Sequence, residues 1–251
     1  MKRQLIISTL CLVLLMVMML STTLAWFTDN KSNVNTMVAG KISIEQKEYS
    51  DAAHTTEFEN NKFVMMPSQT VIKEVVVTNI GNQPAYVRTL FAFEDKAYTD
   101  EDGNKQTVLD MLTTESKGSI VIPSGADKVQ FTVAKDGKET VFTVGYYVHP
   151  DALSHEDDKD DVVVLNAVKL KAEATNAWQT AVGEKYELLV LSQATQTSGL
   201  DNLGENGTES PAAALDKAFA PITDESCAKW FALVLGGEAT GNAITIAPAN
   251  P

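Results

Sequence analysis

Histidines and carboxylates gather in one stretch of the sequence where a divalent cation could bind. His149 and His155 lie near Asp157 and Asp158, within or just before the acidic run 156–161. Imidazole nitrogens and carboxylate oxygens are metal ligands, so His149, His155, Asp157 and Asp158 are candidates for weak divalent-cation binding. Charge runs usually extend into water, and a solvated acidic connector is the simpler interpretation. We expect no resident metal and no other cofactor.

The sequence contains no recognisable motif for hydrolytic chemistry. It lacks His-Glu-x-x-His, which places two zinc ligands on one helix face, and it lacks the two-glycine frame of a nucleophile elbow. Cys227 lies in an apolar stretch with Ala228 and Phe231, which predicts a buried small residue and not a catalytic thiol. In the segment 100–104 the glycine stands too early for a calcium loop, so we expect a turn. We therefore expect no catalytic residues and no enzymatic activity.

Aromatic residues offer a further type of site. Tyr146, Tyr147, Trp178 and Trp230 could form a carbohydrate-binding platform, because flat rings combine apolar faces with polar tips. Their positions in strand or helix patterns favour packing in a core or on a sheet.

The elements that must position these residues are mostly strands. Apolar residues alternate or cluster with β-branched ones, which puts one set of side chains on each face of a sheet. In the segment 85–94, Val87, Phe91 and Phe93 share an apolar face, which predicts a strand with one buried side. Asp136-Gly137 predicts a hairpin turn. The predicted strands are 41–45, 70–78, 85–94, 119–122, 128–134, 140–148, 162–174 and 186–194.

Helical signals are few, and they lie between or after the strands. The predicted helices are 107–114, 212–220 and 224–235, the last with Asp224 as its N-cap. No βαβ pattern is visible, so the sequence predicts an all-β two-sheet sandwich over residues 41–235. Residues 198–211 are expected to form an exposed loop, and residues 236–251 a flexible tail.

The first 25 residues have the parts of a signal peptide. Lys2 and Arg3 precede the apolar run 5–20, and polar residues follow before Ala25. This run is short for a transmembrane helix, which needs about 20 apolar residues. We expect cleavage between Ala25 and Trp26, with a retained anchor as the alternative. The mature chain would then be secreted, to an extracellular matrix or the cell surface, and membrane contact would end with cleavage.

The charge balance restricts the partners of the mature chain. Residues 1–25 contain two basic and no acidic residues, so the remainder has 18 Lys and Arg against 33 Asp and Glu, a net charge of −15. Such a surface repels nucleic acid and anionic lipid. Cys227 is the one cysteine after the leader, so an intrachain disulfide cannot form. The fold must depend on its apolar core.

The junction after the leader resembles that of the TasA and camelysin family, secreted proteins of Gram-positive bacteria that are processed by a SipW-type signal peptidase. The resemblance rests on Ala-Trp-Phe-Thr-Asp at 25–29 and Asn-Thr-Met-Val-Ala-Gly at 35–40, where Met37 replaces the usual aromatic residue. Weaker agreement extends over segments 66–70, 77–88, 145–147 and 193–196. The segment beyond Ser198 does not clearly match.

The resemblance implies a jelly-roll-like sandwich and, as in the best-known members, assembly into fibres of the extracellular biofilm matrix. The partners would then be further copies of the chain, other matrix components and the signal peptidase during export. Cleavage would free a mobile N-terminal segment, 26–40, which could add as a strand to the sheet edge of the next copy. The residues expected in this assembly strand are Trp26, Phe27, Asn35, Thr36, Ala39, Gly40, Ile42 and Ile44. Two alternatives remain open: a camelysin-like cell-surface metallopeptidase and a monomeric cell-surface or adhesion module.

Overall fold

The computed structural model describes residues 40–59, 64–116, 118–135, 138–154, 161–183, 185–197, 210–235 and 245–249. The predicted signal peptide, the predicted cleavage residues Ala25 and Trp26, and the expected assembly-strand residues before Gly40 lie outside this range. His155, Asp157 and Asp158 lie outside it too. The described residues belong to one compact unit, 40–251.

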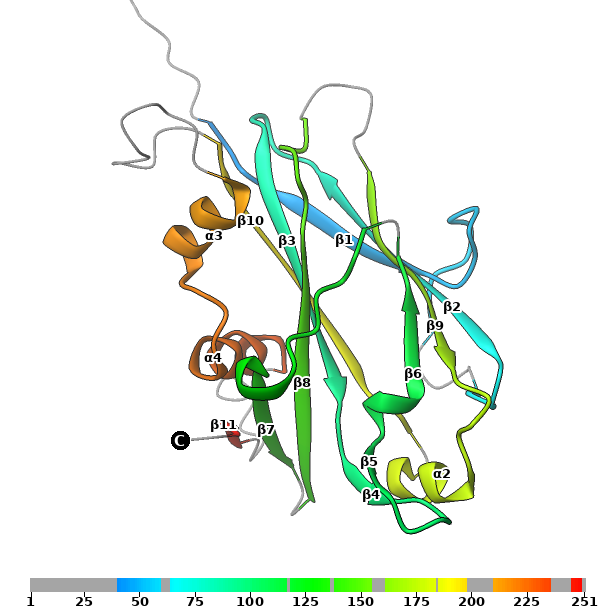
Figure 1. The fold of residues 1–251 in the computed structure, drawn as a ribbon. Helices are drawn as coiled ribbons and strands as arrows, with labels where there is room; N and C mark the ends of the chain where they lie inside the picture. The colour runs from blue at the N-terminus through cyan, green and yellow to red at the C-terminus, as the bar shows by residue number, and fades with distance from the viewer. Residues whose placement is uncertain are drawn as a thin grey trace, which may run out of the picture. The chain divides into compact units, whose positions relative to one another are not determined.

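Two antiparallel sheets form the body of this unit (Figure 1). Sheet A has the order β1-β2-β9-β6 and is built from β1 (Ile44–Tyr49), β2 (Thr70–Asn79), β9 (Val162–Leu170) and β6 (Leu112–Glu115). Sheet B has the order β10-β3-β8-β7-β11 and is built from β10 (Leu188–Gln196), β3 (Ala85–Glu94), β8 (Lys138–Val148), β7 (Gln130–Lys135) and β11 (Thr245–Pro248). The predicted all-β two-sheet sandwich is confirmed.

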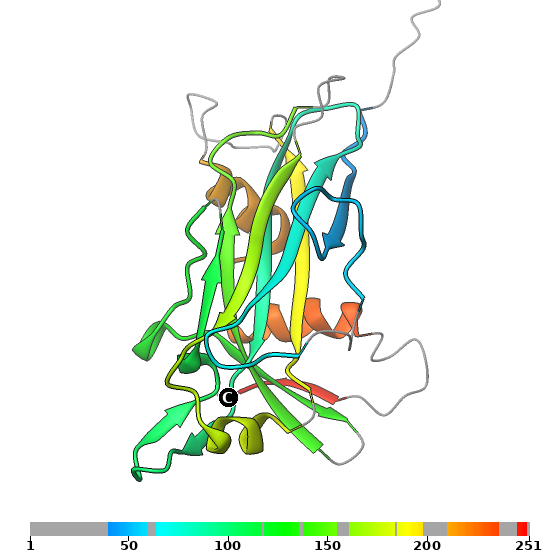
Figure 2. The same ribbon diagram turned by 90° about the vertical axis from the view of Figure 1, so that its right-hand side faces the viewer.

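The chain crosses from one sheet to the other several times, for example between β2 and β3, between β8 and β9, and between β9 and β10. Connections that cross between two sheets are typical of Greek-key sandwiches. Smaller elements lie near one end of the sandwich (Figure 2). They are the ribbon of β4 (Ala97–Thr99) and β5 (Lys105–Thr107), the 3₁₀ turns η1 (Leu109–Met111) and η2 (Gly125–Asp127), and the helix α2 (Asn176–Val182).

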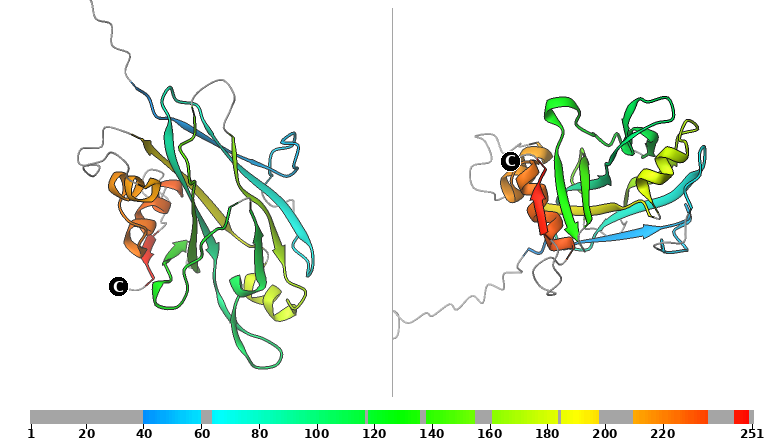
Figure 3. Two further views of the ribbon diagram at one scale, coloured as in Figure 1. Left: turned by 45° about the horizontal axis from the view of Figure 1, so that its top comes forward. Right: turned by 90° about the horizontal axis from the view of Figure 1, so that it is seen from below.

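Two C-terminal helices, α3 (Pro211–Phe219) and α4 (Asp224–Val234), form a third layer on sheet B (Figure 3). α3 contacts β3 and β10, and α4 contacts β7 and β11. The prediction of a single buried face for β3 is therefore wrong: Leu90 and Ala92, on the face opposite Phe91 and Phe93, are as fully buried. The second face is buried because the helices cover it.

The molecule accordingly has two apolar cores. One fills the space between the sheets and includes Val75, Phe91 and Phe93. The other lies between sheet B and α4, where the ring of Phe131 stacks on Phe231 with centroids 5.1 Å apart. Burying such side chains is the dominant favourable contribution to folding, at about 25 cal/mol per Å² of apolar surface.

Several predicted elements differ from the structure. The strand expected over 119–122 is reduced to a single bridge between Val121 and Tyr146, and the strand expected over 41–45 begins only at Ile44. The helix expected over 107–114 is replaced by β5, η1 and β6, because residues 112–115 pair with β9. Helix α4 begins at Asp224 as predicted, but its N-cap is Thr223, whose hydroxyl accepts from Ser226 N, and Asp224 instead accepts from Gln130 N at 2.9 Å. Finally, the expected flexible tail contains β11, which pairs with β7.

Candidate functional site

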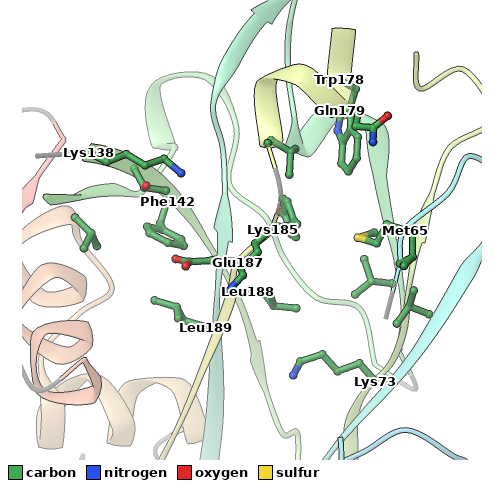
Figure 4. A pocket seen from close by; sticks show the side chains of 18 of the residues that line it. Met65, Lys73, Lys138, Phe142, Trp178, Gln179, Lys185, Glu187, Leu188 and Leu189 are labelled. Carbon is green, nitrogen blue, oxygen red and sulfur yellow. The ribbon is translucent and has the colours of Figure 1, made fainter. Parts of the chain in front are cut away.

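A groove of about 1110 Å³ opens beside the start of β10 (Figure 4). Its walls come from β2 and the loop before it, from β9 and α2, and from the β7–β8 hairpin. Side chains of both cores line it: Val168 and Leu188 belong to the core between the sheets, and Phe142 and Leu189 to the core under α4. The groove therefore passes around the outer edge of β10 and reaches both faces of sheet B.

Two strand edges border the groove without a backbone partner among the described residues. β1 ends at Tyr49 opposite Glu74, so the part of β2 before Glu74 extends beyond β1. β10 pairs with β3 on one side, and on the other side it meets β1 through a side-chain hydrogen bond from Ser192 Oγ to Gln46 Oε1, 2.7 Å long. Unpaired edges are the places where a sheet accepts a further strand.

The register fixes which backbone groups β10 offers at this edge. Glu94 N donates to Glu187 O, and Glu94 lies opposite Glu187, so alternate residues from 187 onward point their backbone groups toward β3. Leu188, Val190 and Ser192 therefore present their N–H and C=O groups to the outer edge. A strand added there would have regularly spaced donors and acceptors to pair with.

The surface around these edges is unusually apolar. β10 begins with Leu-Leu-Val-Leu at 188–191, and all four side chains are half-buried. On the other wall, Val64 is 70% exposed. A long apolar edge strand is an association site unless something covers it, and large exposed apolar patches commonly mark interaction surfaces.

Lysines surround the groove although the chain as a whole is acidic. Lys73, Lys135, Lys138 and Lys185 line it together with Glu187, the one carboxylate among the described residues of the lining. Figure 4 labels Lys73, Lys138, Lys185 and Glu187. Lys73 pairs with Glu48 and lies over the ring of Phe58. The other three are exposed, and none of them forms an ion pair within the described part of the chain.

Buried carboxylates support this end of the sandwich from within. Glu94 is 2% exposed, and burial raises its pKa, while its Oε2 accepts from Glu187 N at 3.2 Å. Burial alone would also raise the pKa of Asp95, but hydrogen bonds from Lys128 and Thr143 outweigh it and hold that pKa below the ordinary value. These contacts fix the ends of β3 and β8 beside the groove.

The opposite end of the sandwich receives the chain from residue 39, and we call it the Gly40 end. Lys41 N donates to Asn82 Oδ1 and Asn82 N donates to Lys41 O, so residues 41–43 lie against the hairpin between β2 and β3. A Cβ atom at Gly81 would collide with the Lys41 carbonyl oxygen, so this close approach requires glycine. β3 runs from the Gly40 end to the groove, and ten residues at about 3.4 Å each separate the two by about 30 Å.

Ile42 and Ile44 were expected in the assembly strand; Ile44 is the first residue of β1 in sheet A, and Ile42 lies just before that strand. Ile44 is opposite Asn79, and both isoleucines pack against the core between the sheets. Backbone and core contacts hold these two residues within their own copy. Of the other residues expected in the assembly strand, the structure describes Gly40 alone. Gly40 itself is exposed, beside Gln83.

Of the four candidate metal ligands, the structure places His149 alone. Its Nδ1 lies 2.7 Å from Asp151 O, which orients the ring within its own loop. Within the described ranges, no three His, Cys, Asp or Glu side chains gather as a metal site. The turn 100–104 is explained locally, because the Asp100 carboxylate accepts from Asp102 N and Asn104 N.

The remaining candidate residues pack as the sequence indicated. Cys227 is buried in the core under α4, and burial raises the pKa of its thiol to about 12. Trp178 is 4% exposed and donates from Nε1 to Val108 O, and Trp230 lies over the Arg88 guanidinium at 5.0 Å. Tyr147 packs against the core between the sheets. Such a dispersed arrangement does not make a sugar-binding platform of these rings.

The groove was not found from the sequence. Its clearest signal is the run of four apolar residues at 188–191, which does not alternate and so indicates a strand with both faces covered. Nothing in the sequence says that this strand stands at an edge.

Comparison with known proteins returned no matching family model and no matching curated protein. Within the described residues, none of the helices is long and apolar enough to cross a membrane.

Proposed function

We propose that the mature chain is a secreted structural subunit that joins copies head to tail into extracellular fibres. In this proposal, residues 26–40 of one copy add as a strand along the outer edge of β10 in the next copy. The observation that carries the proposal is the apolar groove between two unpaired strand edges, about 30 Å from the Gly40 end. The resemblance of the leader junction to the TasA and camelysin family supports it.

The sequence of the added segment suits an edge that opens onto two cores. In a strand, Val34 and Val38 share one face, and Met37 and Ala39 share the other. One set would enter the core between the sheets and the other would approach the core under α4. The outward backbone groups of Leu188, Val190 and Ser192 would pair with the segment, and each such hydrogen bond adds about 1 kcal/mol. Backbone pairing gives the affinity, and the alternating side chains give the register.

Such a contact joins different surfaces of two copies, so it does not close on itself and generates a filament. The net charge of −15 in the mature chain opposes close approach of the copies. We therefore expect assembly to depend on protein concentration and on added salt.

Two variants separate donor from acceptor. Deleting residues 26–39 removes the donor segment and leaves the described unit intact. Val190→Pro removes one outward N–H from the edge of β10. It removes no hydrogen bond to β3, because the N–H of Val190 points away from that strand, and edge positions of this kind tolerate proline. Val190→Ala is the matched control, because it shortens the side chain and keeps the N–H. Circular dichroism confirms folding of each.

Negative-stain electron microscopy and size-exclusion chromatography then give distinct outcomes. We expect filaments from the wild type and from Val190→Ala, and monomers from each of the other two variants. An equimolar mixture of the deletion variant and Val190→Pro should give dimers and no filaments, because one can only accept and the other only donate. Filaments from the deletion variant would refute the proposal.

A further inference from the structure

Sheet B has two edges, and they differ in what they offer to another strand. One edge is β10, which presents the backbone groups of Leu188, Val190 and Ser192 to the groove. The other edge is β11, a strand of four residues that lies along the outer side of β7 (Figure 1). A sheet with two equally open edges would accept a further strand on each side.

β11 pairs with the backbone groups that β7 directs away from β8. Ala249 N donates to Gln130 O at 3.2 Å, so alternate residues of β7 from Gln130 onward point their backbone groups toward β11. Thr132 and Ala134 are the next residues in this alternation, and Ala247 lies opposite Thr132. The edge of β7 therefore has regularly spaced donors and acceptors, and β11 occupies them.

Side-chain packing holds β11 in this place as well. Ile246 lies opposite Val133, and both side chains belong to the core under α4. α4 also contacts β11 directly. The side chains of Thr245 and Ala247, on the other face of the strand, are exposed. The attachment of β11 thus consists of one short ladder of backbone hydrogen bonds and one apolar anchor.

The outer side of β11 is a poor acceptor for a further strand. Because Ala247 and Ala249 face β7, Ile246 and Pro248 are the residues that point their backbone groups outward. Proline has no N–H, so within the described part of β11 only Ile246 offers an outward donor. Short edge strands that contain proline are a common means of preventing edge-to-edge association.

We infer that β11 closes the edge of β7 against a second copy of the chain, so that sheet B keeps β10 as its one acceptor edge. The strand that β11 excludes is the β7 edge of the other copy. Two uncovered β7 edges would present the same donors and acceptors to each other, and they would pair antiparallel about a two-fold axis. Such a contact closes on itself and gives a dimer.

In a fibre, the same contact would join neighbouring filaments side by side. This consequence rests on the proposed function, whereas the closure of β7 by β11 does not. With β11 in place, each copy would accept one donor segment at β10 and offer no second edge of sheet B. The filaments would then grow without lateral junctions through this sheet.

The test is made in the variant that lacks residues 26–39, because it has no donor segment and retains the whole described unit. Ala247→Pro removes an N–H that faces β7 and should detach β11, whereas Ala247→Ser keeps this N–H and is the matched control. Sedimentation velocity should show dimers for Ala247→Pro and for a chain that also lacks residues 245–251. The parent and Ala247→Ser should be monomers. Circular dichroism verifies folding, and Ala247→Pro decides if the truncated chain does not fold.

Restoring the strand in trans is the second measurement. A synthetic peptide of residues 245–251 should bind to the truncated chain and return it to the monomer. The same peptide with Ile246→Asp should bind at least about tenfold more weakly in isothermal titration calorimetry, because it would place a charge in the core under α4.

Monomers from the folded variants without an attached β11, or dimers that the peptide does not dissociate, would overturn the inference. Electron microscopy of residues 26–244 should show filaments joined side by side, and single filaments like those of the wild type would also contradict it. If the wild type forms no filaments, the proposed function fails, while the comparison of monomers with dimers still tests the closure of β7.

Discussion

The ion pair between Arg88 and Asp216 should be the main attachment of helix α3 to sheet B. Arg88 on β3 is 1% exposed, and its guanidinium donates to Asp216 Oδ1 at 2.6 Å, to Gln193 Oε1 at 2.6 Å and to Ala220 O at 3.0 Å. The ring of Trp230 from α4 lies 5.0 Å away. One buried cation thus connects β3, β10 and both C-terminal helices.

Replacing Asp216 by alanine leaves this buried cation without its counter-charge. Removing one partner of a fully buried pair costs about 3–5 kcal/mol. Asp216 is 43% exposed, so water already shares its charge and the loss must be smaller. We expect Asp216→Ala to lower the free energy of unfolding by about 2 kcal/mol. Arg88→Met combined with Asp216→Ala should be less destabilised than the sum of the two single variants, because no unpaired charge remains.

Urea unfolding of residues 26–251, followed by circular dichroism, measures this difference, and the slopes are compared to detect changes in cooperativity. Glu225→Ala is the control: it breaks the pair between Glu225 and Lys229, whose side chains are 73 and 72% exposed, and should cost less than about 0.5 kcal/mol. If Asp216→Ala costs no more than Glu225→Ala, the pair does not hold the helices and the reasoning is wrong.

Three further predictions concern single residues. Ala220 has φ 84° and ψ 159°, a conformation that suits glycine, so Ala220→Gly should raise the midpoint of urea unfolding, by about 1 kcal/mol in stability; a lowered midpoint would contradict this. The Cys227 thiol, with a pKa of about 12, should not react with a thiol reagent at pH 8 until the protein unfolds, and labelling of the native protein at the unfolded rate would exclude its burial. Burial raises the pKa of Glu94, so the folded state binds this proton more tightly than the unfolded state and loses stability as pH rises from about 4.5 through the folded pKa. Glu94→Gln, which mimics the protonated form, should therefore be more stable than the wild type at pH 7 and gain nothing at pH 4, as urea titrations at both pH values would show.

Strand positions follow from the sequence where local pattern and tertiary setting agree. The predicted strands 70–78 and 85–94 correspond to β2 and β3 almost residue for residue, because β-branched or alternating runs are bounded there by turn residues. The predicted helix 107–114 failed for the opposite reason. Apolar residues at 108, 109, 111 and 112 have helical spacing, but Thr113 and Thr114 pair with β9, and this pairing outweighs the local preference.

The position of the groove at a sheet edge could not be predicted from the sequence pattern. The pattern at 188–191 indicates a strand covered on both faces, and the structure agrees, since its side chains alternate between the two cores. Whether such a strand stands inside a sheet or at its edge depends on which strands neighbour it, and that is decided by topology far away in the sequence. The lysines that line the groove come from separate parts of the chain, and topology brings them together for the same reason.

The direction of β10 favours addition between copies over insertion of a segment into its own groove. β10 runs from the groove toward the Gly40 end, since Leu188 lies opposite Phe93 and Gln196 opposite Ala85. A segment that folds back from Gly40 into its own groove would run from residue 26 to residue 40 in the same direction as β10, and would pair parallel to it. The same segment entering the groove of the next copy in line runs in the opposite direction and pairs antiparallel. Antiparallel pairing is slightly more stable per residue and continues the pattern of sheet B. In the proposed assembly, the direction of this one edge strand would thus disfavour self-closure and favour filament growth.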